Sequence, residues 1–381
     1  MKKKLLNISA IGVILLNSFT NYAQETIYYV GHSLVNIDIP HQVREIQNLA
    51  EVPNFYMHHI NIGASLQLNW NDTNYHAHPI WDPILGEDVY KGSNHLVELL
   101  NPYDHLVLTE AVPIRNYHTD TVVKYMTNFI ELGQEGNPSI EKYLYATWEG
   151  DVADGEDWRN TLDTLLPVWE NIADETELEL GGGTVNIVPG NIAMMNLYDE
   201  LQEGPIGSYT SISQFFQPDG IHLSHEGNYL IACLMSVVVY NTIPIGQDSI
   251  KAGSYTDEFC IDDSVARFRI QEIAVETACE YARSGYTSDY CDNASIQSSV
   301  SENARVSIWP NPSNGEFQLI ATEKINQLEV FSLDGKKVHT QLQGFDEIEL
   351  THLPEGLYFI QINFDNKEIV TEKIIIKSAI Q

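Results

Sequence analysis

The sequence predicts an α/β protein of three layers, a parallel sheet with helices on both faces, followed by a small C-terminal β-sandwich domain. From about residue 25 to 245, short apolar runs alternate with amphipathic stretches, which is typical of strands and helices that alternate along a parallel sheet. From Val306 onward the pattern changes to short runs separated by turn signals such as Asp334-Gly335, which is typical of antiparallel hairpins.

Residues 1–23 have the composition of a secretory signal peptide. Three lysines, Lys2 to Lys4, precede an apolar run from Leu5 to Leu16 that is too short to span a bilayer. No later stretch reaches about 18 consecutive apolar residues. We therefore expect an exported chain without a membrane span.

The elements of the first domain follow from its periodicity. Strands are expected where short apolar runs end in turn residues, at 27–30, 55–62, 105–109, 142–147 and 185–188. Helices are expected where apolar residues recur every three or four positions, at 41–50, 122–132, 158–172 and 192–201. In the first of these helices the apolar residues are Val43, Ile46 and Leu49.

The rest of the chain divides into an extension, a linker and a tail. The first domain is expected to span residues 24–283, of which 246–283 form an extension of less certain pattern with one or two helices at 261–281. Residues 284–303 are rich in Ser, Asp and Asn and indicate a linker. Residues 304–381 are expected to form about seven strands, including 317–320, 327–332, 347–350, 357–363 and 369–376.

The net charge of the chain argues against nucleic acid and membrane-surface partners. With 53 acidic and 20 basic side chains the formal charge is −33, which repels nucleic acid phosphates and anionic lipids.

The four cysteines are expected to differ in state. Cys233 lies in an apolar helical run and is expected to be a buried thiol. In an oxidising compartment, two of Cys260, Cys279 and Cys291 are able to form a disulfide, and their pairing stays open.

Two separated motifs contain the parts of a hydrolytic triad. Gly31-His32-Ser33-Leu34 follows the first expected strand, and ligands of parallel α/β sheets bind beyond the carboxyl ends of the strands. Asp219 and His222 stand three residues apart far downstream. A serine nucleophile needs a base within reach, and the base needs a group that fixes its tautomer. We expect Ser33, His222 and Asp219 in these roles; the alternative for Ser33 is a helix N-cap.

The tetrahedral intermediate of such a reaction also needs hydrogen-bond donors for its oxyanion. The backbone N–H groups of Ser33 and Gly63 are candidates. Gly63 follows the second expected strand, where a glycine permits close approach of the backbone to a substrate.

Residues 26–240 resemble the SGNH, or GDSL-like, hydrolase family. Gly31-His32-Ser33-Leu34 is similar to its first block, Gly63 to its second, and Asp219-Gly220-Ile221-His222-Leu223 to its fifth. The resemblance implies a flavodoxin-like sheet and a serine esterase mechanism that needs no cofactor or metal. Secreted members of the family often remove acetyl groups from carbohydrates, so an acylated carbohydrate or another small ester is the implied substrate.

The third block departs from the family pattern. Its Gly-x-Asn-Asp sequence, whose Asn completes the oxyanion hole, is replaced around Glu110. A carboxylate opposes a developing oxyanion unless it is protonated or turned away. Asn116 is a weaker candidate for the missing donor, and His32, Glu110 and Trp148 are candidates for the substrate cleft. The departure favours a second hypothesis, a non-catalytic surface protein that binds glycans. A third hypothesis, a lipase-like enzyme for longer acyl chains, ranks below both because the sequence has no long apolar lid segment.

Several histidines invite a metal hypothesis. His58, His59, His76 and His78 are close in sequence, with Asp72 nearby, but their spacing fixes no converging set of ligands. We therefore expect no metal site.

The tail resembles the C-terminal sorting domain of the type IX secretion system. The resemblance rests on Trp309-Pro310-Asn311-Pro312-Ser313-Asn314-Gly315, Leu328-Glu329-Val330-Phe331-Ser332-Leu333-Asp334-Gly335 and Leu353-Pro354-Glu355-Gly356-Leu357-Tyr358. It implies passage through the periplasm, engagement of the type IX machinery, and release or attachment at the cell surface.

Overall fold

The structure is a computed structural model of the chain. It describes residues 24–36, 38–72, 78–82, 87–91, 94–247, 261, 263–288, 291, 306–309, 313–321, 324–332, 336–345, 347–354, 356–365 and 369–376. The expected signal peptide, Cys260 and most of the expected linker lie outside these residues.

The centre of the first domain is a five-stranded parallel sheet. Its strands are β1 (Glu25–Gly31), β2 (Asn54–Ile60), β5 (His105–Leu108), β6 (Glu141–Tyr145) and β7 (Asn186–Val188). They lie in the order β2-β1-β5-β6-β7, which is the flavodoxin-like order 2-1-3-4-5 when these five strands are counted along the chain. The predicted fold class is therefore confirmed. The strand order reverses between β1 and β5, and this switch point is where such sheets bind ligands.

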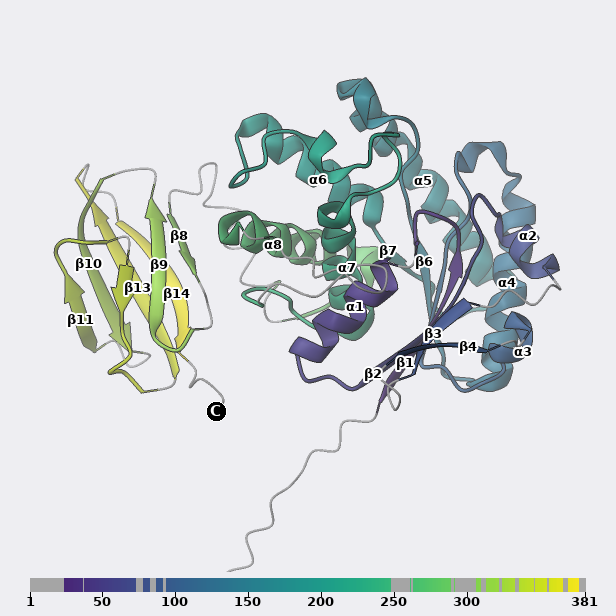
Figure 1. The fold of residues 1–381 in the computed structure, drawn as a ribbon, viewed down its shortest axis with the longest axis horizontal. Helices are drawn as coiled ribbons and strands as arrows, with labels where there is room; N and C mark the ends of the chain where they lie inside the picture. The colour runs from purple at the N-terminus through teal and green to yellow at the C-terminus, as the bar shows by residue number, and fades with distance from the viewer. Residues whose placement is uncertain are drawn as a thin grey trace, which may run out of the picture.

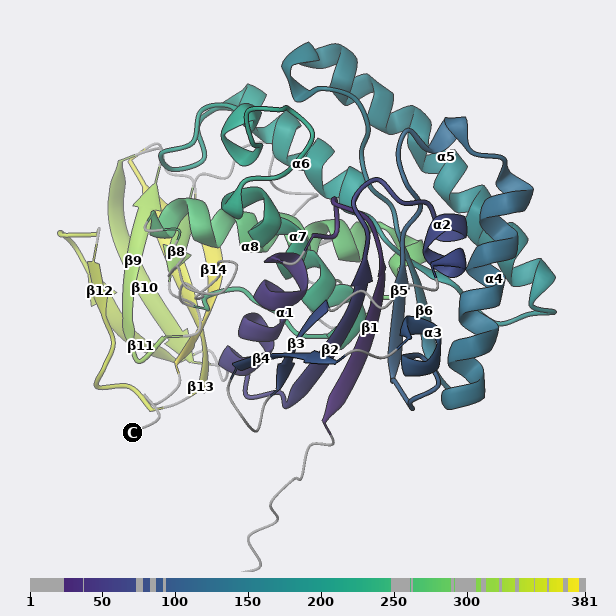
Figure 2. The same cartoon turned by 45° about the vertical axis from the view of Figure 1, so that its right-hand side comes forward.

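Helices cover both faces of this sheet (Figures 1 and 2). On one face, α1 (Asp38–Leu49) packs against α7 (His225–Tyr240), and α8 (Ser264–Glu280) packs against α7. On the other face, α4 (Thr119–Gly136) packs against α5 (Glu156–Glu179). The remaining long helix, α6 (Gly190–Glu203), contacts α5, α7 and α8.

Helix α7 is apolar on all sides, which is expected of a helix enclosed by other elements. Its residues from Gly227 to Val239 are all buried. Cys233 is among them as a free thiol, which confirms that prediction. Where one or two helices were predicted, at 261–281, the structure has the single helix α8, and the 3-10 turn η4 (Ala282–Ser284) follows it.

The chain between β2 and β5 holds four short elements that the sequence did not predict. They are α2 (Leu66–Asn71), the antiparallel pair β3 (His78–Asp82) and β4 (Glu87–Lys91), and α3 (His95–Glu98). Each has four to six residues, which is too few to show a helical or strand period. Strand β2 ends at Ile60, two residues before the predicted end, and the Asn61 N–H makes the last bond of its pairing with β1, to the Gly31 carbonyl.

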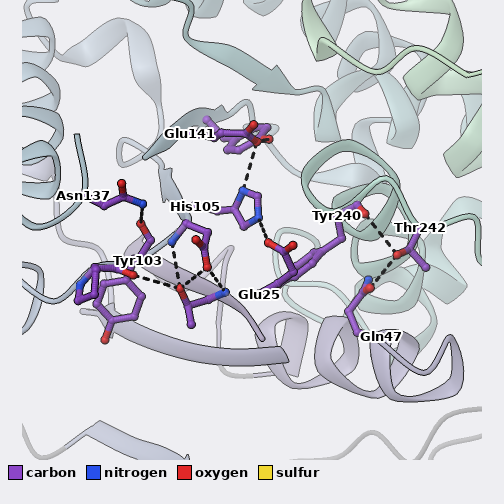
Figure 3. A network of polar contacts seen from close by, with 12 residues as sticks. Glu25, Gln47, Tyr103, His105, Asn137, Glu141, Tyr240 and Thr242 are labelled. Atoms are coloured by element: carbon purple, nitrogen blue, oxygen red, sulfur yellow. Dashed lines mark hydrogen bonds and ion pairs between the residues drawn. The ribbon is translucent and has the colours of Figure 1, made fainter. Parts of the chain in front are cut away.

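A polar network holds the amino edge of the sheet (Figure 3). The His105 ring at the start of β5 lies between Glu25 of β1 and Glu141 of β6, with nitrogen-to-oxygen distances of 3.1 and 3.3 Å. The Tyr143 hydroxyl also donates to Glu141, at 2.6 Å. Contact with His105 lowers the pKa of Glu141 from 4.5 to about 2. Three neighbouring strands are thus connected through side chains at the edge where they begin.

A disulfide joins Cys279, near the end of α8, to Cys291, which lies in the expected linker. The sequence left this pairing open. The remaining candidate, Cys260, lies outside the described residues.

The tail forms two antiparallel sheets with a core of their own. One sheet has the order β11-β10-β13-β14 and the other β12-β9-β8. The strands are β8 (Val306–Trp309), β9 (Glu316–Ala321), β10 (Ile325–Ser332), β11 (Lys337–Gln341), β12 (Glu347–Glu349), β13 (Gly356–Phe364) and β14 (Ile369–Ile376). Side chains such as Leu328, Ile348 and Ile360 fill the space between the sheets. This agrees with the predicted sandwich.

Within the part of the chain that the structure describes, no helix combines the length and apolarity needed to cross a bilayer.

Candidate active site

Ser33 lies on a turn between β1 and α1, here called the Ser33 turn (residues 31–36). Gly31 is required where the turn begins, because a Cβ there would lie 2.6 Å from Thr109 Cγ2 and 2.8 Å from Val35 Cγ2. At the other end, the Asn36 side-chain oxygen accepts from the N–H groups of Asp38 and Ile39 and so caps α1. The turn therefore places the serine just beyond the carboxyl end of β1, at the switch point of the sheet.

Asp219 and His222 share one loop before α7, here called the His222 loop (residues 216–223). Phe216 and Leu223 form a β-bridge at its base, and the Gln217 N–H donates to the His222 carbonyl at 2.7 Å. Gly220 has a φ of +74°, which favours glycine. A Cβ at Gly220 would also lie 2.0 Å from Asp151 Oδ1, so the tight turn requires a residue without a side chain.

The structure brings Ser33, His222 and Asp219 into one chain of hydrogen bonds. His222 Nδ1 lies 2.6 Å from Asp219 Oδ2, and His222 Nε2 lies 2.9 Å from Ser33 Oγ. An ionised carboxylate only accepts, so Nδ1 carries the ring proton and Nε2 is left to accept from the serine hydroxyl. Hydrogen bonding to His222 lowers the pKa of Asp219, which keeps this carboxylate ionised near neutral pH.

Trp148, a predicted cleft residue, is fully buried after β6. Its indole N–H donates to the Ile221 carbonyl at 2.8 Å, and its ring packs edge-on against Phe216. Trp148 therefore contacts the His222 loop from within the core and holds Ile221, the residue before His222.

Gly63 is exposed and has a φ of +67° on the loop after β2, here called the Gly63 loop (residues 61–65). Two donors attach this loop to the Gly31 carbonyl: the Asn61 N–H at 3.2 Å and the buried Asn69 side chain at 3.0 Å. Among the described residues, none of the hydrogen bonds uses the N–H of Ser33 or Gly63. Neither group therefore has a hydrogen-bond acceptor within the described residues.

Glu110 follows β5 and is 1% exposed. Its carboxyl oxygens accept from the Ala111 N–H at 2.7 Å and from the Leu66 N–H at 3.2 and 3.3 Å. Burial raises the pKa of Glu110 to about 7. The Glu110 carboxyl group is therefore engaged with backbone donors of its own loop and of the first turn of α2.

His32 lies beside Glu110 and is 2% exposed. Leu34 N–H donates to its Nδ1 at 3.4 Å, so Nε2 carries the proton and donates to the Glu110 carbonyl at 2.9 Å. Burial lowers the pKa of His32 to about 4, which leaves the ring neutral. It connects the Ser33 turn to the loop after β5.

The other sequence candidate, Asn116, is exposed at the end of the 3-10 turn η1 (Ile114–Asn116). No hydrogen bond to its side chain occurs among the described residues. The adjacent backbone is held by Glu149, whose carboxylate accepts from the Ile114 N–H at 3.0 Å.

The sequence did not reveal several positioning residues. Asn36 Nδ2 donates to the buried Asn228 of α7 at 3.1 Å and so connects the Ser33 turn to the helix after His222. Asn69 is equally buried on α2. The N-cap serine before α2, Ser65, was the one local signal that this segment turns into a helix.

No group of three or more His, Cys, Asp or Glu side chains suited to a metal ion occurs within the described residues. His76 and the side chain of His78, which the sequence analysis considered, lie outside them.

Comparisons with known proteins identify the tail and the fold of the first domain. Residues 307–377 match the secretion system C-terminal sorting domain family. This match confirms the predicted sorting domain and, with it, export of the chain to the cell surface or its surroundings. No curated protein sequence matches this chain.

Among solved structures, a DUF4886 family protein from Bacteroides uniformis is similar at a TM-score of 0.52 and 14% identity. The similarity covers 68% of this chain and 96% of that protein, and at this identity it shows a shared fold. A lipase/acylhydrolase from Enterococcus faecalis is similar at a TM-score of 0.34 and 15% identity, over 56% of this chain and 93% of that protein. A carbohydrate esterase family 3 protein from Talaromyces cellulolyticus is similar at a TM-score of 0.32 and 11% identity, over 55% of this chain and 93% of that protein. TM-scores below 0.5 give these last two no weight for function.

Proposed function

We propose that the first domain is a serine esterase that removes acetyl or other small acyl groups from a carbohydrate outside the cell. The observation that carries the proposal is the continuous hydrogen-bonded chain from Asp219 through His222 to Ser33, with distances of 2.6 and 2.9 Å. These are the separations that nucleophilic catalysis by a serine requires.

In the first half-reaction, Ser33 Oγ attacks the ester carbonyl while His222 Nε2 takes the hydroxyl proton. The Asp219 carboxylate, which is ionised near neutral pH, stabilises the imidazolium that results. The N–H groups of Ser33 and Gly63 donate to the oxyanion of the tetrahedral intermediate. When the intermediate collapses, the proton on Nε2 passes to the departing alcohol, and the acyl group remains on Ser33.

In the second half-reaction, water attacks the acyl-serine while His222 Nε2 accepts one of its protons. Collapse of this second intermediate returns the proton to Ser33 Oγ and releases the carboxylic acid. No cofactor enters either step.

The substrate class rests on two supports besides the triad. The sorting domain directs the chain out of the cell, where acylated polysaccharides are accessible. The sequence resemblance to the SGNH hydrolases implies small acyl groups and carbohydrate alcohols.

The test is hydrolysis of p-nitrophenyl acetate by the mature chain, with Ser33→Ala as the variant. We expect the rate to fall roughly 10³-fold or more, because the nucleophile is lost. Ser213→Ala is the matched control, since Ser213 is an exposed serine that hydrogen-bonds Ser211 on a 3-10 turn. Turnover that is equal in Ser33→Ala and the wild type would refute the proposal.

Glycan binding without turnover is the second candidate, and Glu110 in the third block is the observation that favours it. A fluorophosphonate probe separates the two functions, since it labels an activated serine regardless of the ester preferred. Absence of labelling at Ser33, combined with binding of an acetylated oligosaccharide, would favour the second candidate.

A further inference from the structure

We propose that Glu110 is a positioning residue that holds the Gly63 loop against the Ser33 turn. The inference rests on the proposed esterase function and assigns a role to the residue that departs from the family pattern. Glu110 acts through the backbone of the Gly63 loop, and its carboxyl group is not assigned a contact with substrate.

The contacts of Glu110 reach all three segments that meet at the switch point of the sheet. Its carboxyl group accepts from the N–H of Leu66, the first residue of α2 directly after the Gly63 loop, and from the N–H of Ala111 in its own loop. Its carbonyl accepts from His32 of the Ser33 turn. One residue therefore connects both proposed oxyanion donors to the loop after β5.

The Gly63 loop needs such a connection. Its other attachment to the Ser33 turn is at the Gly31 carbonyl, through Asn61 at the beginning of the loop and Asn69 beyond its end. Gly63 itself is exposed, and an ideal Cβ built on it meets no atom within 4 Å. Glu110 fixes Leu66 and thereby restrains Gly63 from its C-terminal side.

The strength of this restraint depends on the charge of Glu110. An ionised carboxylate forms hydrogen bonds roughly twice as strong as those of a neutral acceptor. Burial raises the pKa of Glu110 to about 7, so the carboxyl group changes charge in the range where esterases are assayed. The Gly63 loop is held more firmly above this pH than below it.

The titratable groups that face Glu110 do not change charge in that range. Burial lowers the pKa of His32 to about 4, so this ring stays neutral. Burial, and then the charge of Glu110, raises the pKa of Tyr117 above its ordinary value. His222 interacts with His32 and is retained in both proteins.

The experiment compares kcat and KM for p-nitrophenyl acetate in the wild type and Glu110→Gln, from about pH 5.5 to about pH 9. Glutamine retains an acceptor oxygen but never carries the charge. We expect the ratio of variant to wild-type kcat to stay near one at low pH and to fall roughly fivefold as the pH rises through 7, with a constant ratio of KM. A ratio that is flat across the range, or that rises above one at high pH, would overturn the positioning role.

Glu272→Gln is the matched control. Burial likewise raises the pKa of Glu272 to about 7, but this residue lies on α8 and pairs with Arg269. The ratio of the Glu272→Gln kcat to the wild-type kcat is expected to be independent of pH.

A second measurement separates this inference from the proposed function. Hydrogen exchange of the Leu66 amide, corrected for intrinsic rates, should be faster in Glu110→Gln than in the wild type above pH 7. If the wild type neither hydrolyses esters nor reacts with fluorophosphonate, the esterase proposal fails, and this comparison alone judges the positioning role. Equal protection in the two proteins would overturn it.

Discussion

The two nitrogens of His222 determine what chemistry the site can perform. Nδ1 faces Asp219 from the same loop, and Nε2 faces Ser33 from a turn 189 residues away in sequence. The contact between His222 Nε2 and Ser33 Oγ depends on core residues that hold the His222 loop in place, and one of them is Trp148. Its indole N–H reaches the Ile221 carbonyl, one residue before the base.

We expect Trp148→Phe to lower kcat for p-nitrophenyl acetate roughly tenfold with little change in KM, because a small displacement of the base costs rate more than binding. Phenylalanine keeps the aromatic packing on Phe216 but cannot donate to Ile221. Trp158→Phe is the matched control. Its ring also packs edge-on against Phe216, and its indole N–H has no hydrogen-bond partner among the described residues. Equal losses in both variants would indicate a packing effect alone.

At the scale of elements, the His222 loop is built on a turn that tolerates a single residue type. Gly220 combines a left-handed φ with close contact to Asp151, and its carbonyl accepts from the Val152 N–H at 3.0 Å. The segment after β6 therefore supports the loop through both Trp148 and Val152.

Gly220→Ala is expected to destabilise the fold by about 1–2 kcal/mol from the left-handed φ alone, with a further cost from the Asp151 contact. The melting temperature and kcat of Gly220→Ala should both be lower than those of the wild type. Removing the contact in Asp151→Ala/Gly220→Ala should recover part of the loss. Gly204→Ala is the control, since Gly204 has an extended φ of 171° and no atom within 4 Å of an added Cβ. A melting temperature unchanged in Gly220→Ala would contradict the expectation.

The elements also show what a single sequence can predict. The long elements of the sheet and its helices were predictable because each buries a continuous apolar face, as in α4 and α5. The motif residues Ser33, Asp219 and His222 were predictable as candidates because each motif is local in sequence. The short elements α2, β3, β4 and α3 were missed because they have too few residues to show a period.

The connecting side chains were not predictable for a different reason. Asn36 and Asn228, or Glu110 and Leu66, meet only in the folded chain, and neither partner differs in sequence from an ordinary polar or apolar residue. Trp148 was noticed as an aromatic of the cleft, but its hydrogen bond to Ile221 depends on the path of a loop 73 residues away.

At the scale of the whole molecule, the two ends of the parallel strands carry different groups of polar residues. The proposed triad lies at the carboxyl ends of the strands, and the network around His105 lies at their amino ends (Figure 3). Folding stability at acid pH is therefore expected to depend on the amino edge. Contact with His105 lowers the folded-state pKa of Glu141 from 4.5 to about 2, so the stability it contributes is present above pH 4.5 and is lost as the pH falls toward 2.

We expect the melting temperature of the wild type to exceed that of Glu141→Gln at neutral pH and the difference to shrink toward zero between pH 4.5 and 2. Glu203→Gln, at the exposed end of α6, is the control and should follow the wild type throughout. Esterase activity at neutral pH should be the same in all three proteins. A difference that persists at pH 2 would mean that Glu141 acts through packing instead of charge.

The shared loop of Asp219 and His222 has a consequence for how the site fails. The acid and the base are three residues apart, so their geometry is a local property that travels with the loop as one body. If the loop shifts as one body, the contact between Asp219 and His222 is kept, while the separation of His222 Nε2 from Ser33 Oγ grows. Such a shift would disconnect the proposed nucleophile from an acid–base pair that itself stays assembled.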